Sequence, residues 1–102
     1  MTELEAQGAS EAIWSGWITT GPKTKEFERQ IAEYCHVNKA VCLNSQTACA
    51  EMALRLLGIG AENGGSSFDE VIVPAYTYTA SASVVCHVGA KLVLIDSQTD
   101  SL

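Results

Sequence analysis

Short apolar runs alternate with helical segments along this chain, and that alternation constrains its fold more than any other feature. The runs fall in the segments Ala40–Leu43, Val71–Val73 and Lys91–Ile95. Apolar residues follow one another there without polar alternation, which is typical of strands buried on both faces of a parallel sheet. Parallel strands need crossover connections, usually helices, and these are almost always right-handed. The sequence therefore predicts an α/β fold in which helices cover both faces of a parallel sheet.

Helices are expected over residues 22–36, 47–57 and 79–88. Pro22 suits the first turn of a helix, where its missing N–H costs nothing, and Gly58 and Gly89 suit the position after a helix end. The first helix carries apolar residues at helical spacing on one face. The other two are apolar almost all round and should be mostly covered.

The remaining segments are polar. Residues 1–16 are expected to be the end of a helix or a loose arm, and the Gly- and Ser-rich residues 60–70 a mobile loop. Within the second helix, Glu51 and Arg55 lie four residues apart, a spacing at which opposite charges pair.

Length, composition and charge restrict the class of protein. The chain has 102 residues, enough for one small domain, and 47% of them are hydrophobic, which fits a chain that buries a core. Its net charge is −6 and it has no basic run, so we expect no nucleic-acid partner. The apolar runs are too short to span a bilayer, and the acidic start MTELEAQGAS does not resemble a signal peptide. These features predict a cytoplasmic protein without a membrane partner.

The cysteines and histidines form no pattern that would bind a metal ion, so no metal site is predicted. No C-x-x-C pair occurs, and we expect free thiols, buried as small apolar side chains in a reducing compartment. His36 and His87 have no second ligand nearby and are expected at helix ends. The cysteines are Cys35, Cys42, Cys49 and Cys86.

Candidate binding residues follow the predicted strands. Ligands of open parallel sheets bind beyond the carboxyl ends of the strands, so the segments Asn44–Thr47, Pro74–Tyr78 and Asp96 should meet at one edge. In the first segment, N–H groups at a helix start and the hydroxyls of Ser45 and Thr47 suit a phosphate. The alternative is that Ser45 or Thr47 only caps the helix.

The second segment carries two aromatic residues, Tyr76 and Tyr78. An aromatic ring beside a phosphate site suggests a flat ligand stacked on it, whereas the alternative is packing in the core. No G-x-G-x-x-G follows a predicted strand and no G-x-x-x-x-G-K-[ST] occurs, which argues against dinucleotide and nucleoside-triphosphate sites.

Two long stretches of the sequence resemble one known family. They are SGWITTGPKTKEFERQIAEYCHVNKAVCLNSQTACAEMALRLLGIG and DEVIVPAYTYTASASVVCHVGAKLVLID. Together they closely resemble the start of the DegT/DnrJ/EryC1/StrS family of pyridoxal-phosphate-dependent aminotransferases, most of which act on nucleotide-linked keto sugars. The motifs G-W-x-T-T-G-P, N-S-x-T-A and D-E-V-I-V-P-A-x-T-Y occur in the family's order.

The resemblance implies an α/β fold of the aspartate-aminotransferase-like (type I) class, with this chain as the N-terminal part of the large cofactor-binding domain. Residues 1–21 would form an arm and a leading loop, and residues 22–102 the alternating helices and strands. The implied cofactor is pyridoxal 5′-phosphate, with its ring stacked on Tyr78 while Tyr76 packs. Thr20 and Gly21 would approach the sugar substrate. The phosphate would be held by Ser45, Gln46, Thr47 and Ala48, although the family usually has glycine where Gln46 stands.

The resemblance also implies an activity. Amino transfer would run from an amino acid, glutamate, to a nucleotide-linked keto sugar, for cell-surface polysaccharide or deoxysugar biosynthesis, in a homodimer. The lysine that bonds covalently to the cofactor, and the aspartate at its pyridine nitrogen, come from later segments in the family. We therefore expect a fragment that is inactive by itself. Two alternatives are a sugar dehydratase of the same family and a non-catalytic assembly module. The lysines that match neither role are Lys23, Lys25, Lys39 and Lys91.

Overall fold

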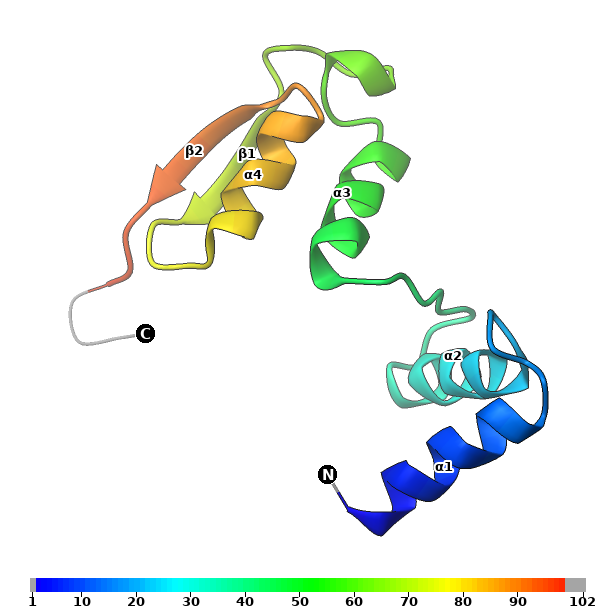
Figure 1. The fold of residues 1–102 in the computed structure, drawn as a ribbon. Helices are drawn as coiled ribbons and strands as arrows, with labels where there is room; N and C mark the ends of the chain where they lie inside the picture. Colours follow the sequence, from blue (N-terminus) through cyan, green and yellow to red (C-terminus); the bar gives the residue numbers. More distant parts are fainter. Residues whose placement is uncertain (1, 99–102) are drawn as a thin grey trace. The chain divides into compact units, whose positions relative to one another are not determined.

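A computed structural model describes residues 2–98 of the chain (Figure 1). The chain divides into two compact units, Met1–Cys42 and Leu43–Leu102, which are described separately. No helix among residues 2–98 is both long enough and apolar enough to cross a membrane.

The first unit contains two helices, α1 (Glu3–Trp14) and α2 (Pro22–Tyr34). Of the two possibilities for the first sixteen residues, the structure has the helix, and the Thr2 hydroxyl and N–H both donate to the carboxylate of Glu5 near its start. Helix α2 begins at Pro22, as predicted, and ends two residues earlier than expected. An ion pair of 2.9 Å between Lys23 Nζ and Glu11 Oε2 joins the two helices.

Residue His36 follows the end of α2, as predicted for a helix-end histidine. Its φ of 54° is a left-handed conformation that glycine usually occupies at this position. The His36 N–H donates to the Glu33 carbonyl at 3.1 Å, and the Val37 N–H to the Ala32 carbonyl at 2.9 Å. These two bonds satisfy carbonyl groups that the last turn would otherwise leave unpaired.

The strand predicted at Ala40–Leu43 is wrong for this structure, because the segment has no strand pairing. The Cys42 N–H donates instead to the Glu28 side chain, Oε1, at 2.9 Å. A β-ladder needs a neighbouring strand, and the two strands described elsewhere in the chain pair with each other.

The second unit contains α3 (Gln46–Leu56), the 3₁₀ turn η1 (Ala61–Asn63), β1 (Glu70–Pro74), α4 (Thr79–His87) and β2 (Lys91–Ile95). Strands β1 and β2 are parallel neighbours, with Val71 opposite Leu92 and Val73 opposite Leu94. The prediction of strands here, and of their parallel pairing, is confirmed. Helix α4 is the crossover between them (Figure 1).

The core of this unit lies between α4 and the two strands. Val73, Val84 and Val85 are buried together, and Val71 and Leu92 pack against them from the sheet. Helix α3 adds Ala50 and Leu54 to this cluster but has no fully buried residue of its own.

Helices α3 and α4 end as their glycines predict. Gly58 and Gly89 have φ values of 69° and 71°, and each N–H donates back to the preceding turn. The Ile59 N–H also bonds the Leu54 carbonyl at 3.0 Å, and the Ala90 N–H bonds the Val85 carbonyl at 3.2 Å. This pair of bonds is a Schellman motif at each end.

Two burial predictions are wrong in this structure. Helix α3 was expected to be mostly covered, yet Met52 and Leu56 on it are exposed. The cysteines are free, as expected, but three of them are exposed rather than buried: Cys35, Cys49 and Cys86. Apolar composition indicates a tendency to be buried, but burial also needs a second element against that face. Among the described residues, Met52, Leu56 and these three cysteines have no such cover.

The loop between η1 and β1 is organised around Asp69. Its Oδ2 accepts the N–H of Gly60 and the N–H of Ser66, both at 2.9 Å. Both bonds lower the pKa of the Asp69 carboxyl below its ordinary value of 3.8, and the bond from Ser66 has the larger effect.

Because the folded-state pKa of Asp69 is lowered, the stability it contributes is present above about pH 4 and is lost as the pH falls further. We expect Asp69→Asn to be less stable than the parent at pH 7 and to lose less stability on acidification. Urea unfolding at a series of pH values measures both effects. Glu62→Gln, in the same loop, is the control and should follow the parent; equal pH dependence in Asp69→Asn and the parent would contradict the prediction.

Candidate functional site

The start of α3 combines a helix cap with free backbone donors. Ser45 is the N-cap residue, and its Oγ accepts the N–H of Ala48 at 3.1 Å. The Cys49 N–H then bonds the Ser45 carbonyl at 3.1 Å, which is the first bond of the helix. Within the described residues, no protein acceptor is bonded to the N–H of Gln46 or of Thr47. Two donors therefore remain at the positive end of the helix dipole.

The structure is compatible with both interpretations of this segment, the helix cap and the phosphate site. Ser45 caps the helix, which is the simpler alternative, and its oxygen engages the N–H of Ala48. The capping bond leaves the N–H donors of Gln46 and Thr47 at the helix start, together with the hydroxyl of Thr47, a half-buried residue. The roles expected of Ser45, Gln46, Thr47 and Ala48 toward a phosphate stay predictions.

Tyrosine 78 begins the next helix. It is the N-cap residue of α4, with extended backbone angles, and its side chain is 83% exposed. The exposed ring is accessible to a ligand on the side where α4 starts.

The expected packing of Tyr76 is wrong in this structure, because its side chain is 85% exposed. The Ala75 N–H still donates to the Ile95 carbonyl at 2.7 Å, so the chain follows the sheet up to that residue. It then leaves β1 in a turn that no described element of the second unit covers, and both tyrosines lie beyond that point.

Three segments of the second unit lie at one end, as the parallel topology predicts. Helices α3 and α4 both start at the end where β1 and β2 finish (Figure 1). Asp96 follows β2 directly, is exposed, and accepts the Ser97 N–H on its Oδ1 at 2.9 Å. The segment Asn44–Ala48 itself contains no charged side chain. Attraction of an anion there would come from N–H groups, hydroxyls and the helix dipole.

The two residues expected near a sugar substrate belong to the first unit. Gly21 is the N-cap residue of α2 and is buried, whereas Thr20 is exposed. A Cβ on Gly21 would lie 3.1 Å from Trp17 Cβ, so glycine allows the Trp17 side chain to pack closely on this turn. Their role toward a substrate stays a prediction.

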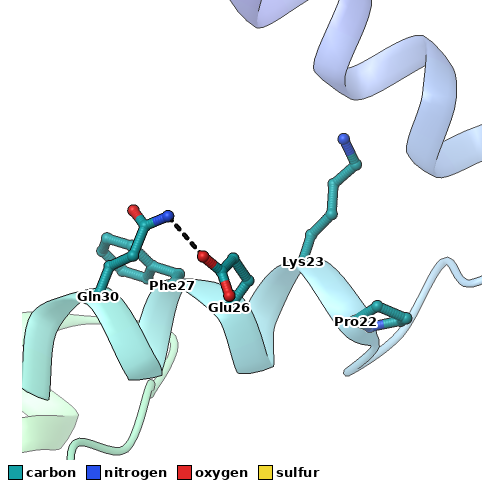
Figure 2. A pocket seen from close by; sticks show the side chains of 5 residues that line it. All are labelled: Pro22, Lys23, Glu26, Phe27 and Gln30. Carbon is teal, nitrogen blue, oxygen red and sulfur yellow. Dashed lines mark hydrogen bonds between the residues drawn. The ribbon is translucent and has the colours of Figure 1, made fainter.

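The first unit has two open pockets beside this turn. One, of about 510 Å³, is lined in part by Ile13, Trp17, Gly21 and Lys23. The other, of about 450 Å³, lies along α2 (Figure 2). Its lining residues are Pro22, Lys23, Glu26, Phe27 and Gln30. In this second pocket the Gln30 amide donates to Glu26 Oε1 at 2.7 Å.

Sequence reasoning missed one polar contact between α3 and α4. Glu51 Oε1 accepts from Arg55 Nε and Nη2, the pair that the spacing predicts, while Glu51 Oε2 lies 3.1 Å from His87 Nδ1. The Arg55 and His87 hydrogen bonds lower the pKa of the Glu51 carboxyl. Glu51 and His87 are 36 residues apart, so no local spacing could have indicated that they meet.

The sequence model of the DegT/DnrJ/EryC1/StrS aminotransferase family matches residues 1–102. This chain belongs to that family. The resemblance predicted from the motifs is therefore confirmed.

Two curated relatives are similar to this chain over almost its whole length. The UDP-4-amino-4-deoxy-L-arabinose–oxoglutarate aminotransferase of Shewanella sediminis is 37% identical over 98% of this chain and 24% of its own length. The spore coat polysaccharide biosynthesis protein SpsC of Bacillus subtilis is 36% identical over 96% of this chain and 24% of its own length. The chain thus spans about a quarter of the length of these relatives.

A solved structure supports the fold. Spr1654 from Streptococcus pneumoniae, in its PLP form, is 52% identical and superposes with a TM-score of 0.87. The match covers 99% of this chain and 24% of that one. The same protein has also been solved in a PMP form. The chain therefore has part of the PLP-dependent aminotransferase fold, as the sequence predicts.

Proposed function

We propose that this chain contributes the phosphate-binding helix start and the ring-stacking tyrosine of a pyridoxal-phosphate-dependent sugar aminotransferase. The observation that carries the proposal is the start of α3, where the N–H groups of Gln46 and Thr47 have no protein acceptor among the described residues. Tyr78 begins α4 at the same end of the second unit (Figure 1). The PLP and PMP forms of Spr1654 support the choice of ligand.

The residues present fit a phosphate monoester. A phosphate accepts hydrogen bonds, and the helix start offers two N–H donors and the Thr47 hydroxyl. No carboxylate lies in the segment Asn44–Ala48 to repel the anion. The helix dipole adds about 0.3–1 kcal/mol, and each hydrogen bond to the charged phosphate about 1.5–3 kcal/mol.

Each residue of this site has a separate task. Gln46 and Thr47 bind the phosphate and fix the position of the cofactor, while Tyr78 holds the pyridine ring flat by stacking. The bound cofactor supplies an electron sink for the reaction. Because stacking on Tyr78 fixes the plane of the cofactor ring, it also determines from which side of that ring a substrate can approach.

The proposal extends to the substrate and setting. The amino donor is an amino acid, glutamate, and the acceptor a nucleotide-linked keto sugar. The name of the Shewanella sediminis relative supports this choice, because it pairs a UDP-linked amino sugar with oxoglutarate. SpsC supports a role in polysaccharide biosynthesis. Thr20 and Gly21, on the turn before α2, are the residues proposed to approach the sugar. The protein is proposed to work in the cytoplasm as a homodimer.

Substitution of Thr47 and Tyr78 tests the proposal in the full-length protein. Thr47→Val keeps the side-chain shape but removes one donor, and we expect pyridoxal phosphate to bind about tenfold more weakly. Tyr78→Ala should also weaken binding and change the absorbance spectrum of the bound cofactor, because the ring loses its stacking partner. Fluorescence titration with pyridoxal phosphate measures the affinity.

Tyr76→Ala is the matched control for Tyr78→Ala. Its ring is as exposed as that of Tyr78, so its removal should alter neither the melting temperature nor cofactor affinity by much. Parent-like cofactor affinity in both Thr47→Val and Tyr78→Ala would mean that this segment is only a capped helix start.

A further inference from the structure

The turn that carries Tyr78 is held by two hydrogen bonds to the same residue, Ser81. The hydroxyl oxygens of Ser81 and Thr77 lie 3.0 Å apart. The Ser81 N–H donates to the carbonyl oxygen of Tyr78 at 2.9 Å. Ser81 is therefore bonded both to Tyr78 and to the residue that precedes it.

Ser81 is itself attached to the core. It lies in the first turn of α4, four residues before Val85, so the two side chains share one face of the helix. Val85 is 1% exposed and belongs to the buried cluster with Val73 and Val84. Ser81 is half-buried, whereas Thr77 and Tyr78 are exposed. Ser81 thus lies on the same helix face as a core residue and is hydrogen-bonded to the exposed turn.

An exposed tyrosine ring needs such support if it is to hold a ligand in one orientation. The Tyr78 side chain is 83% exposed, so packing restricts it little. Its direction depends mainly on the backbone of its own residue. The carbonyl of that residue and the hydroxyl of the preceding Thr77 are both hydrogen-bonded to Ser81. A loose backbone would let the ring sample several directions and would weaken stacking through the entropy lost on binding.

We infer that Ser81 is a positioning residue for Tyr78, acting through the Thr77 hydroxyl and the Tyr78 carbonyl. The inference rests on the proposed function, because it assumes that the cofactor ring stacks on Tyr78. Ser81 touches neither cofactor nor substrate in this role. Its hydroxyl fixes the turn, and the turn presents the ring.

Removing the Ser81 hydroxyl in the full-length protein tests the inference. Ser81→Ala keeps the N–H bond to Tyr78 but loses the bond to Thr77, and we expect pyridoxal phosphate to bind about three- to tenfold more weakly. The visible circular dichroism band of the bound cofactor should change in the same direction as in Tyr78→Ala, by a smaller amount. Ser81→Thr, which retains a hydroxyl, should restore both values.

Ser83→Ala is the matched control. The Ser83 hydroxyl donates at 3.2 Å to the Ala80 carbonyl of its own helix, and within residues 2–98 it has no hydrogen bond to Thr77 or Tyr78. Its loss should therefore leave affinity and spectrum unchanged. An equal effect in Ser81→Ala and Ser83→Ala would overturn the inference, since any serine in α4 would then matter. Weaker affinity in Ser81→Ala without a spectral change would also overturn it, since that indicates general destabilisation.

The result separates this inference from the proposed function. If Thr47→Val and Tyr78→Ala bind the cofactor weakly while Ser81→Ala binds it like the parent, only the role of Ser81 is refuted. If Tyr78→Ala also binds like the parent, the stacking role fails and the inference fails with it.

Discussion

The purified 102-residue chain is expected to transfer no amino groups from glutamate, even with pyridoxal phosphate present. Transfer of this kind needs an amine that bonds to the cofactor and carries a proton during the reaction. Lys91 is the lysine of the second unit, and it lies at the start of β2. Each residue of a strand advances the chain by about 3.3 Å, so Lys91 is at the opposite end of the sheet from Tyr78.

The Lys91 ammonium group also has a partner at that end of the sheet, because its Nζ forms an ion pair with the Glu70 carboxylate at the start of β1. The remaining lysines, Lys23, Lys25 and Lys39, belong to the first unit and match no family position for this role.

The measurement is formation of 2-oxoglutarate from glutamate with a keto-sugar acceptor. Free pyridoxal phosphate reacts slowly with amino acids, so the same mixture without protein is the control. Turnover by the chain above that background would contradict the prediction and would require one of its own lysines to serve. Lys91→Arg, which keeps the charge at that position, would then show whether Lys91 is the one.

The parts of the fold that sequence predicts well are those that depend on neighbouring residues. Gly58 and Gly89 mark helix ends because the left-handed conformation there favours glycine locally. The strands in Val71–Val73 and Lys91–Ile95 are confirmed because the helix between them, α4, returns the chain so that the two runs pair with each other. Their pairing follows from the crossover between them.

The parts that sequence predicted badly depend on distant partners. Ala40–Leu43 has the apolar pattern of a strand, but no described strand pairs with it, and its Cys42 N–H bonds a glutamate side chain instead. Tyr76 was expected to pack but is 85% exposed, because packing at that position depends on what covers the turn. Composition indicates which residues can be buried, but it does not show which helix or sheet faces are packed against another element.

The candidate site falls between these two cases. The cap at Ser45 was one of two alternatives, and a helix start after a short run of small polar residues is a local signal. Which of its N–H groups stay without a protein acceptor could not be read from the sequence, because Ser45 could have bonded the N–H of Thr47 rather than that of Ala48. The support of Tyr78 by Ser81 likewise depends on rotamers that the sequence does not determine.

Replacement of Gly60 by alanine is expected to destabilise the second unit much more than replacement of Gly64 by alanine. Gly60 has φ 92° and ψ 152°, a region of backbone conformation that is essentially limited to glycine. A Cβ placed there would lie 1.8 Å from the carbonyl oxygen of Val88, which is itself fully buried. Neither backbone can move away easily, because the Gly60 N–H is bonded to Asp69.

Gly64→Ala isolates one of the two causes. Gly64 also has a left-handed φ, of 89°, but a Cβ there would meet nothing within 4 Å. Gly64→Ala should therefore cost only the conformational strain, about 1 kcal/mol, whereas Gly60→Ala adds a steric overlap with the core and should cost about 3 kcal/mol or more. For a domain of this size those values correspond to a lower melting temperature by about 4–8 °C and by at least about 12 °C.

Thermal and urea unfolding of the two variants beside the parent measures the difference. Gly60 lies where the loop from α3 passes against the end of α4, so its loss should also weaken the contact that keeps α3 on the core. Hydrogen exchange of the α3 amides would then rise in Gly60→Ala and stay near parent values in Gly64→Ala. Equal melting temperatures for the two variants would show that the close approach of Gly60 to Val88 does not constrain this fold, and that φ alone determines the cost.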